Sequence, residues 1–207
     1  MAEAGQDLRA GRVVTAELCG VWVSAEWNRL FGALTLAMAG APAAVPGHAG
    51  WMRIVLTMVG VLAALVVIAA VVIRRLPHDP GVWHVDPLTA PTPSTPNSYR
   101  VAPADADVDA DAVAPTYGIA AADLATKFDR VARESGNVDV VGGAPVNGFV
   151  TYVQTSGLFG FPDYISVRFI EVDATSSTLA VFSRSRLGHS DLGVNRKRVT
   201  AWLDQLS

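Results

Sequence analysis

An unbroken apolar run in the first half of the chain constrains its architecture more than any other feature. Ile54 to Ile73 reads IVLTMVGVLAALVVIAAVVI and carries no charged side chain. About twenty such residues form a helix long enough to cross a bilayer core of roughly 30 Å. Trp51 precedes the run and two arginines follow it, and such residues anchor helices at membrane interfaces. The sequence therefore predicts one transmembrane helix over residues 51–76.

A cleaved signal peptide is the closest alternative to a retained anchor. Signal peptides have an apolar region of about 7–15 residues that ends at a small-x-small cleavage site. The run here is longer and ends in RRLPHDP, so we expect an anchor that stays in the membrane. Its orientation stays open, because Arg74 and Arg75 favour a cytoplasmic C-terminal side while Arg53 opposes them.

The first fifty residues form an N-terminal extension for which two interpretations stay open. Leu30 to Ala41 is apolar but too short to span a bilayer comfortably. Met52-Arg53 directly before the apolar run also looks like the natural start of a signal anchor. The extension is therefore either translated or the product of a start site placed too early, and the residues alone do not choose.

Composition excludes several classes of function. The net charge is −3, which argues against a nucleic-acid-binding protein, because such domains carry a basic excess. The single cysteine, Cys19, excludes an intramolecular disulfide and a cysteine-rich zinc site. The four histidines lie far apart along the chain and form no pair of ligands. We therefore expect no cofactor and no metal.

A stretch rich in proline and aspartate follows the apolar run. PLTAPTPSTPNSYR is dominated by Pro, Ser and Thr, which favour extended or irregular backbone. In ADADVDADAVAP, aspartates alternate with small residues from Asp105 onward. A calcium-binding loop would need Gly and Glu where Ala110 and Thr116 stand, so this pattern favours a solvated segment. Residues 77–116 are predicted to be a linker.

Residues 117–207 are predicted to fold as a small α+β domain. Apolar positions repeat with helical spacing in Ala120–Glu134 and again in 192–206. Between them, four runs have the alternation and β-branched content of strands, joined by short turn-rich connections. Short connections make neighbouring strands antiparallel. The expected fold is a four-stranded antiparallel sheet with two helices on one face.

Two blocks near the C-terminus resemble a known bacterial family. They are YVQTSGLFGFPDYISVRF and FSRSRLGHSDLGVNRKRVTAWL, the second carrying the spacing S-R-x-G-x-S-D-x-G-x-N-R-x-R from Ser185 to Arg198. Both resemble the family called domain of unknown function 1499, and WHVDPLTAPTPSTPN resembles its membrane-anchored members. The resemblance covers roughly the last ninety residues. It implies an envelope location and no known activity.

The segment from the last predicted strand to the last predicted helix is the main candidate for function. It is rich in arginine and reaches a helix N-terminus, where free amides and a partial positive charge attract anions. Arginine offers a planar fork suited to carboxylate or phosphate. We predict a site for an anionic small molecule or lipid headgroup on the sheet face left uncovered by the helices. Its residues are Arg168, Arg184, Arg186, Ser190, Asp191, Asn195, Arg196 and Arg198.

Other interpretations of the same segment stay open. Asp191 would cap the last helix and the polar side chains would tie the loop to the sheet, which needs no ligand. A hydrolase-like enzyme would instead use Ser185 or Ser190 with His189 and Asp191, although groups so close in sequence converge with difficulty. No catalytic residue is therefore assigned.

An aromatic loop is a second candidate, for contact with a partner or the membrane. It contains Phe159, Phe161 and Tyr164, whose rings partition into bilayer interfaces when exposed. The alternative is a hairpin tip whose rings pack onto the core. Together these features predict a single-pass protein of a bacterial inner membrane with a periplasmic C-terminal domain. The domain is expected to be a non-enzymatic module that binds a ligand or a partner, and the sequence does not identify a protein partner.

Overall fold

The computed structural model describes residues 47–206. The chain divides into two units, Met1–Ile54 and Val55–Ser207. Helix α2, His48–Arg74, begins in the first unit, and the second unit holds the rest of it together with the whole folded domain. Leu30 to Ala41 and the question of the start site lie outside the described residues.

Helix α2 confirms the predicted apolar helix. It has 27 residues, no buried side chain, and the length and composition needed to cross a membrane. At about 1.5 Å per residue it is roughly 40 Å long, which is more than the roughly 30 Å of a bilayer core. Within the described residues it is the one helix of this kind.

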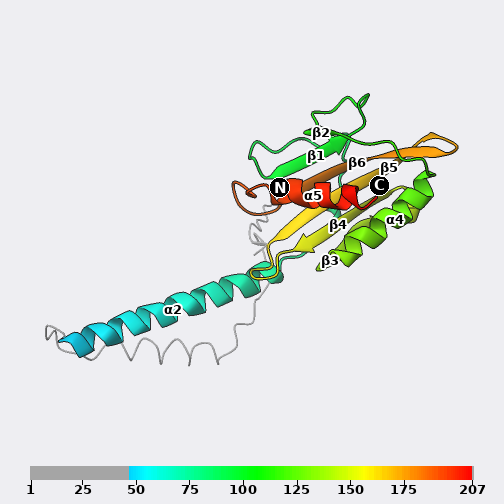
Figure 1. Cartoon of the computed structure of the whole chain (residues 1–207). Helices are drawn as coiled ribbons and strands as arrows, with labels where there is room; N and C mark the ends of the chain where they lie inside the picture. The colour runs from blue at the N-terminus through cyan, green and yellow to red at the C-terminus, as the bar shows by residue number, and fades with distance from the viewer. Residues whose placement is uncertain (1–46, 207) are drawn as a thin grey trace, which may run out of the picture. The chain divides into compact units, whose positions relative to one another are not determined.

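The sheet has six strands, in the order β2-β1-β6-β5-β4-β3, so the prediction of four is wrong (Figure 1). The strands β3 (Val138–Ala144), β4 (Phe149–Thr155), β5 (Pro162–Asp173) and β6 (Ser176–Ser185) form an antiparallel meander, as predicted. The two further strands are β1 (Ser98–Ala102), antiparallel to β6, and β2 (Ala112–Val113), parallel to β1.

Both additional strands come from the stretch predicted to be a linker. Strand β1 pairs along β6, and β2 hydrogen-bonds to β1 through a register that joins Val101 to Ala112. Prolines flank β1 without entering it, so its amides stay available to the ladder. The local composition predicted irregular backbone. Ser98–Ala102 nevertheless forms a strand, because it pairs with β6 far along the chain. The domain therefore begins well before residue 117.

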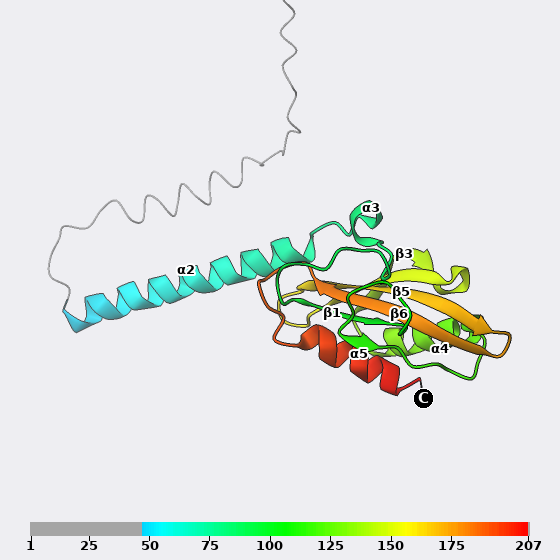
Figure 2. The ribbon, with the colours of Figure 1, turned by 90° about the horizontal axis from the view of Figure 1, so that it is seen from above.

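Two helices cover one face of the sheet, which confirms the α+β class. They are α4 (Ala121–Glu134) and α5 (Val194–Asp204). Their apolar stripes and the inward side chains of the strands form one core, in which Phe128 contacts Tyr152, Phe169 and Trp202. The short connection between β3 and β4 is the 3-10 turn η1 (Pro145–Asn147). In Figure 2, α4 and α5 lie on one side of the sheet and helix α3 (Pro80–Trp83) lies on the other.

The second face is covered by the chain itself. We call residues 77–97, which include α3 and lie between α2 and β1, the strap. The strap crosses β4, β5 and β6: His84 stacks on Phe149, and Trp83 stacks on Tyr164. Asn97 completes it by accepting a backbone hydrogen bond from Ser185 at the end of β6. Both sheet faces are therefore packed, which the sequence did not indicate.

Candidate functional site

Three arginines predicted to line an open sheet face lie under the strap. Arg168 forms a two-armed salt bridge with Asp86. Arg184 donates to the Trp83 carbonyl at 2.7 Å, and Arg186 donates to the Pro77 carbonyl at 2.8 Å. The prediction of an uncovered face is wrong, because these guanidinium groups hold the strap to the sheet.

An aromatic stack fixes the centre of the strap. The rings of Trp83 and Tyr164 lie 3.9 Å apart and nearly parallel, with the guanidinium groups of Arg184 and Arg186 about 5.5 Å from the indole. Tyr164 is completely buried, so its predicted role as an exposed contact residue is wrong. Its hydroxyl hydrogen-bonds the His78 ring at 2.8 Å and accepts from Arg186.

Burial in this cluster lowers the pKa values of several groups. Desolvation and the nearby guanidinium of Arg100 lower the pKa of Arg184 to about 10. Burial and the charge of Arg186 lower the pKa of His78, and burial and the charge of Arg168 lower that of His84. Both imidazoles are therefore held in their neutral form, and the strap packs most stably when they carry no charge.

The arginine-rich motif between Ser185 and Arg198 forms a buried polar network. Asn195 accepts from Ser183 and Arg198 and donates to the carbonyl of Asn97, which joins α5 to the end of the strap. Arg198 also forms a salt bridge with Asp163. These residues thus connect α5, β5, β6 and the strap, which fits the structural interpretation of the motif.

The rest of the motif shapes the turn before α5. Asp191 accepts from the amides of Gly193 and Asn195, as a helix cap does. Ser190 accepts from the amide of Leu192, and the Arg196 guanidinium lies over the Tyr99 ring. Nothing in these contacts assigns a ligand, so a ligand role for these residues stays a prediction.

The arrangement gives the catalytic alternative no geometric support. Among the described residues, no hydrogen bond joins His189 to Ser185 or Ser190. Ser185 instead accepts from the Asn195 amide, and the two carboxylate oxygens of Asp191 bind backbone amides. A nucleophile needs a base within hydrogen-bond reach, and none is placed there.

Two loops at one end of the sheet carry exposed apolar side chains. One loop joins β4 to β5 and the other joins β6 to α5. We call the apolar side chains of these loops, together with Val194 at the start of α5, the rim: Leu158, Phe159, Phe161, Leu187, Leu192 and Val194. Leu158 is 75% exposed and Leu192 is 87% exposed. Phe159 and Phe161 are partly exposed here, and their contact with a partner or the membrane stays a prediction. Leu187 and Leu192 had no distinguishing signal in the sequence.

The rim loops are bonded to the residues that follow the apolar run. The Arg74 guanidinium donates to the carbonyls of Gly157 and Leu158 at 2.8 and 2.9 Å. Gly160 has φ +72°, and a Cβ there would lie 2.3 Å from the Arg74 side chain, so the loop requires glycine. Arg186, at the start of the loop between β6 and α5, donates a hydrogen bond to the carbonyl of Pro77. Both loops are thereby held close to the end of α2.

A pocket of about 370 Å³ opens between the two rim loops. Its walls include Phe161, Leu187, Leu192 and Val194, and Asp163 lies among its lining residues. The Asp163 carboxylate is neutralised there by Arg198. The pocket therefore offers mainly apolar walls next to a compensated ion pair.

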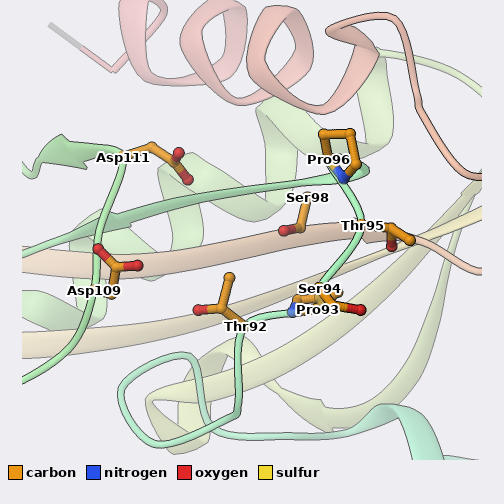
Figure 3. Close-up of a pocket in the computed structure, with 8 residues that line it drawn as sticks. All are labelled: Thr92, Pro93, Ser94, Thr95, Pro96, Ser98, Asp109 and Asp111. Carbon is orange, nitrogen blue, oxygen red and sulfur yellow. The ribbon is translucent and has the colours of Figure 1, made fainter.

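A second pocket, of about 340 Å³, lies between the strap and the segment before β2 (Figure 3). Asp109 and Asp111 lie on one side of it and Thr92 on the other, with Ser98 between them. Arg100 is buried beside it and donates to the Thr92 hydroxyl at 3.3 Å. A neighbouring guanidinium disfavours a bound cation, and residues 47–206 contain no cluster of three metal-binding side chains.

Residues 89–206 match the family described as Protein of unknown function (DUF1499). The chain belongs to this family. The match covers more than half of the chain and includes β1 and β2, which agrees with a domain that begins before residue 117. Neither a curated protein nor a solved structure matches the sequence. In this DUF1499 protein, the strap residues Trp83 and Asp86 precede the matched region.

Proposed function

We propose that this DUF1499 protein is a single-pass protein of a bacterial inner membrane whose domain works at the bilayer surface. In this proposal α2 is the anchor, the domain is periplasmic, and it binds membrane lipid rather than catalysing a reaction. The observation that carries the proposal is the connection between the rim and the end of the apolar helix. A soluble anion is less well supported, because the strap engages the arginines expected to bind it.

The length of the tether limits how far the rim can be from the membrane. Only three peptide steps separate Arg74 from Pro77, whose carbonyl binds β6 through Arg186. Three extended residues span at most roughly 11 Å. The headgroup region on each side of a bilayer is about 5–8 Å thick. In this proposal the sheet end that carries the rim therefore lies in the headgroup layer or directly next to it.

The chemistry of the rim suits that position. Six exposed apolar side chains gather on two adjoining loops, and exposed clusters of this kind mark interaction surfaces. Arg74 and Arg75 supply positive charge at the same end, which anionic lipid headgroups attract. Apolar side chains among headgroups with arginines beside them are the pattern of an interfacial contact.

Spin labels on the full chain in lipid nanodiscs test this proposal. Cys19→Ser removes the native thiol, and a label at Leu158→Cys then reports the rim. A label at Val146→Cys is the matched control, because Val146 is 85% exposed and lies in η1, at the far end of β4. We expect the rim label to be more accessible to oxygen and the control label to be more accessible to a water-soluble nickel complex. Equal accessibility to the nickel complex at both positions would overturn the proposal.

The side of the membrane is tested with the same control cysteine. A membrane-impermeant maleimide should label Val146→Cys in intact bacteria whose outer membrane has been made permeable. Labelling only after the inner membrane is lysed would place the domain in the cytoplasm.

A further inference from the structure

The pocket between the rim loops is the part of the surface with the most definite ligand chemistry. Its volume of about 370 Å³ lies at the lower end of the roughly 300–1,000 Å³ typical of small-molecule sites. Phe161, Leu187, Leu192 and Val194 make its walls largely apolar. Serines and two aspartates complete the lining. A hydrocarbon would contact the apolar walls, whereas an anionic ligand would lie beside the two carboxylates.

Leu192 has a strained backbone conformation in the turn before α5. Its φ is +53°, in the left-handed region that residues other than glycine, asparagine and aspartate rarely adopt. Its side chain is 87% exposed, so burial in the domain does not compensate for this strain. Residues with strained backbone cluster at active sites and ligand-binding positions. Leu192 lines the pocket, and an apolar ligand there would cover part of its side chain.

We propose that this pocket holds a segment of one acyl chain of a bilayer phospholipid. The inference rests on the proposed function, because the short tether is what places the rim among lipids. The limited volume suits one chain rather than a whole lipid, whose second chain would stay in the bilayer. Asp163 is paired with Arg198, and the Asp191 carboxylate, which also lines the pocket, accepts hydrogen bonds from two backbone amides, so both carboxylates keep their partners when a hydrocarbon enters.

Photocrosslinking in nanodiscs tests the inference on the full chain. The probe is a phosphatidylcholine that carries a diazirine near the end of one acyl chain, mixed into phosphatidylcholine and phosphatidylglycerol. After irradiation, peptides are analysed by mass spectrometry. We expect adducts on the segment that contains Leu187 and Val194, in addition to adducts on α2. Adducts confined to α2 would overturn the inference.

Two tryptophan substitutions separate the pocket from the exposed surface. Val194→Trp adds a large ring at a residue that lines the pocket, whereas Leu158→Trp adds the same ring to a rim residue outside the lining. Val194→Trp should abolish the adduct on the Leu187 segment, and Leu158→Trp should preserve it, with unchanged thermal unfolding in both. If Val194→Trp does not fold, Ser190→Trp fills the same pocket from an exposed loop position. Equal adduct yields in filled and unfilled proteins would refute the site.

The two proposals fail in different ways. A rim label at the bilayer together with an unlabelled pocket would overturn the acyl-chain inference and leave the surface function standing. A rim label in water would overturn the proposed function itself. A fatty acid with the same diazirine, added to the detergent-solubilised chain, distinguishes the source of the ligand. Labelling by this acid but not by the phospholipid would overturn the assignment to a bilayer lipid.

Discussion

Replacing Arg198 by alanine tests whether the family motif holds the fold together. The guanidinium binds four side chains, from Gln154 and Asp163 on the sheet side and from Ser183 and Asn195 in the buried network. It is 8% exposed and its carboxylate partner is 13% exposed. Alanine removes every one of these bonds and leaves the carboxylate of Asp163 without its cation.

The magnitude follows from that burial. Breaking a buried ion pair by removing one partner costs about 3–5 kcal/mol, because the remaining charge is desolvated and uncompensated. We expect Arg198→Ala to lower the free energy of unfolding by that amount. Arg198→Lys keeps the charge but loses the planar fork, so it should cost less than alanine and still be destabilising. Asp163→Asn combined with Arg198→Ala should recover part of the loss, since no buried charge then remains.

Thermal unfolding of the full chain in a mild detergent measures these differences. At about 4 °C per kcal/mol for a domain of this size, Arg198→Ala should lower Tm by roughly 12–20 °C. Arg196→Ala is the matched control, because Arg196 is exposed and contacts only the face of Tyr99 among the described residues. If Arg198→Ala lowers Tm by no more than Arg196→Ala does, the structural role is refuted and Arg198 is again a candidate for ligand binding.

Four further changes test the strap and the turns. Trp83→Ala should cost about 2–3 kcal/mol of stability through lost stacking and packing, and hydrogen exchange of strap amides should increase selectively. The pKa values of His78 and His84 are lowered in the folded protein, so the unfolded chain binds protons more readily. The free energy of unfolding should therefore decrease as the pH drops below about 6.5. Replacing both histidines by Gln should make Tm less dependent on pH in this range. Gly143→Ala should cost about 2 kcal/mol or more in the same assay, because φ is +71° and the new Cβ would clash with a carbonyl oxygen at 2.2 Å. Leu192→Asn should raise stability by up to about 1 kcal/mol while weakening lipid photolabelling, and a loss of stability would contradict the assignment of strain there.

Elements with strong local periodicity could be predicted from the sequence. The apolar residues of α4 repeat with helical spacing over several turns, and those of β5 alternate along the strand. In both elements the residues that the pattern marks as apolar are the ones buried in the core. The helix that begins near residue 192 and the antiparallel meander follow for the same reason. The class α+β and the placement of both helices on one face were therefore accessible.

The strap and its strands could not be predicted, because their structure depends on partners far away in the sequence. Strand β1 is held by β6, more than seventy residues later, and its own five residues lie among prolines that indicate irregular backbone. The candidate site could not be predicted for the same reason. From the sequence, Arg184 and Arg186 have no evident partners, because the carbonyls of Trp83 and Pro77 that bind them lie about a hundred residues earlier in the chain. The rim is equally non-local, since its two loops meet only when β4, β5 and β6 align.

The strap gives the anchor a mechanical connection to the sheet. The strap follows α2 closely and crosses three strands before the chain enters the sheet as β1. A force on the helix would therefore be transmitted to the domain through the side-chain contacts of the strap and not through a flexible linker. In order along the chain from the helix, these contacts are the Arg74 bonds to the rim loop, the bond between Arg186 and Pro77, the Trp83 stack and the Asp86 salt bridge. Under tension on the helix, we expect these contacts to break in that order. A change in the position of the anchor would thus uncover the sheet face progressively, beginning at the membrane.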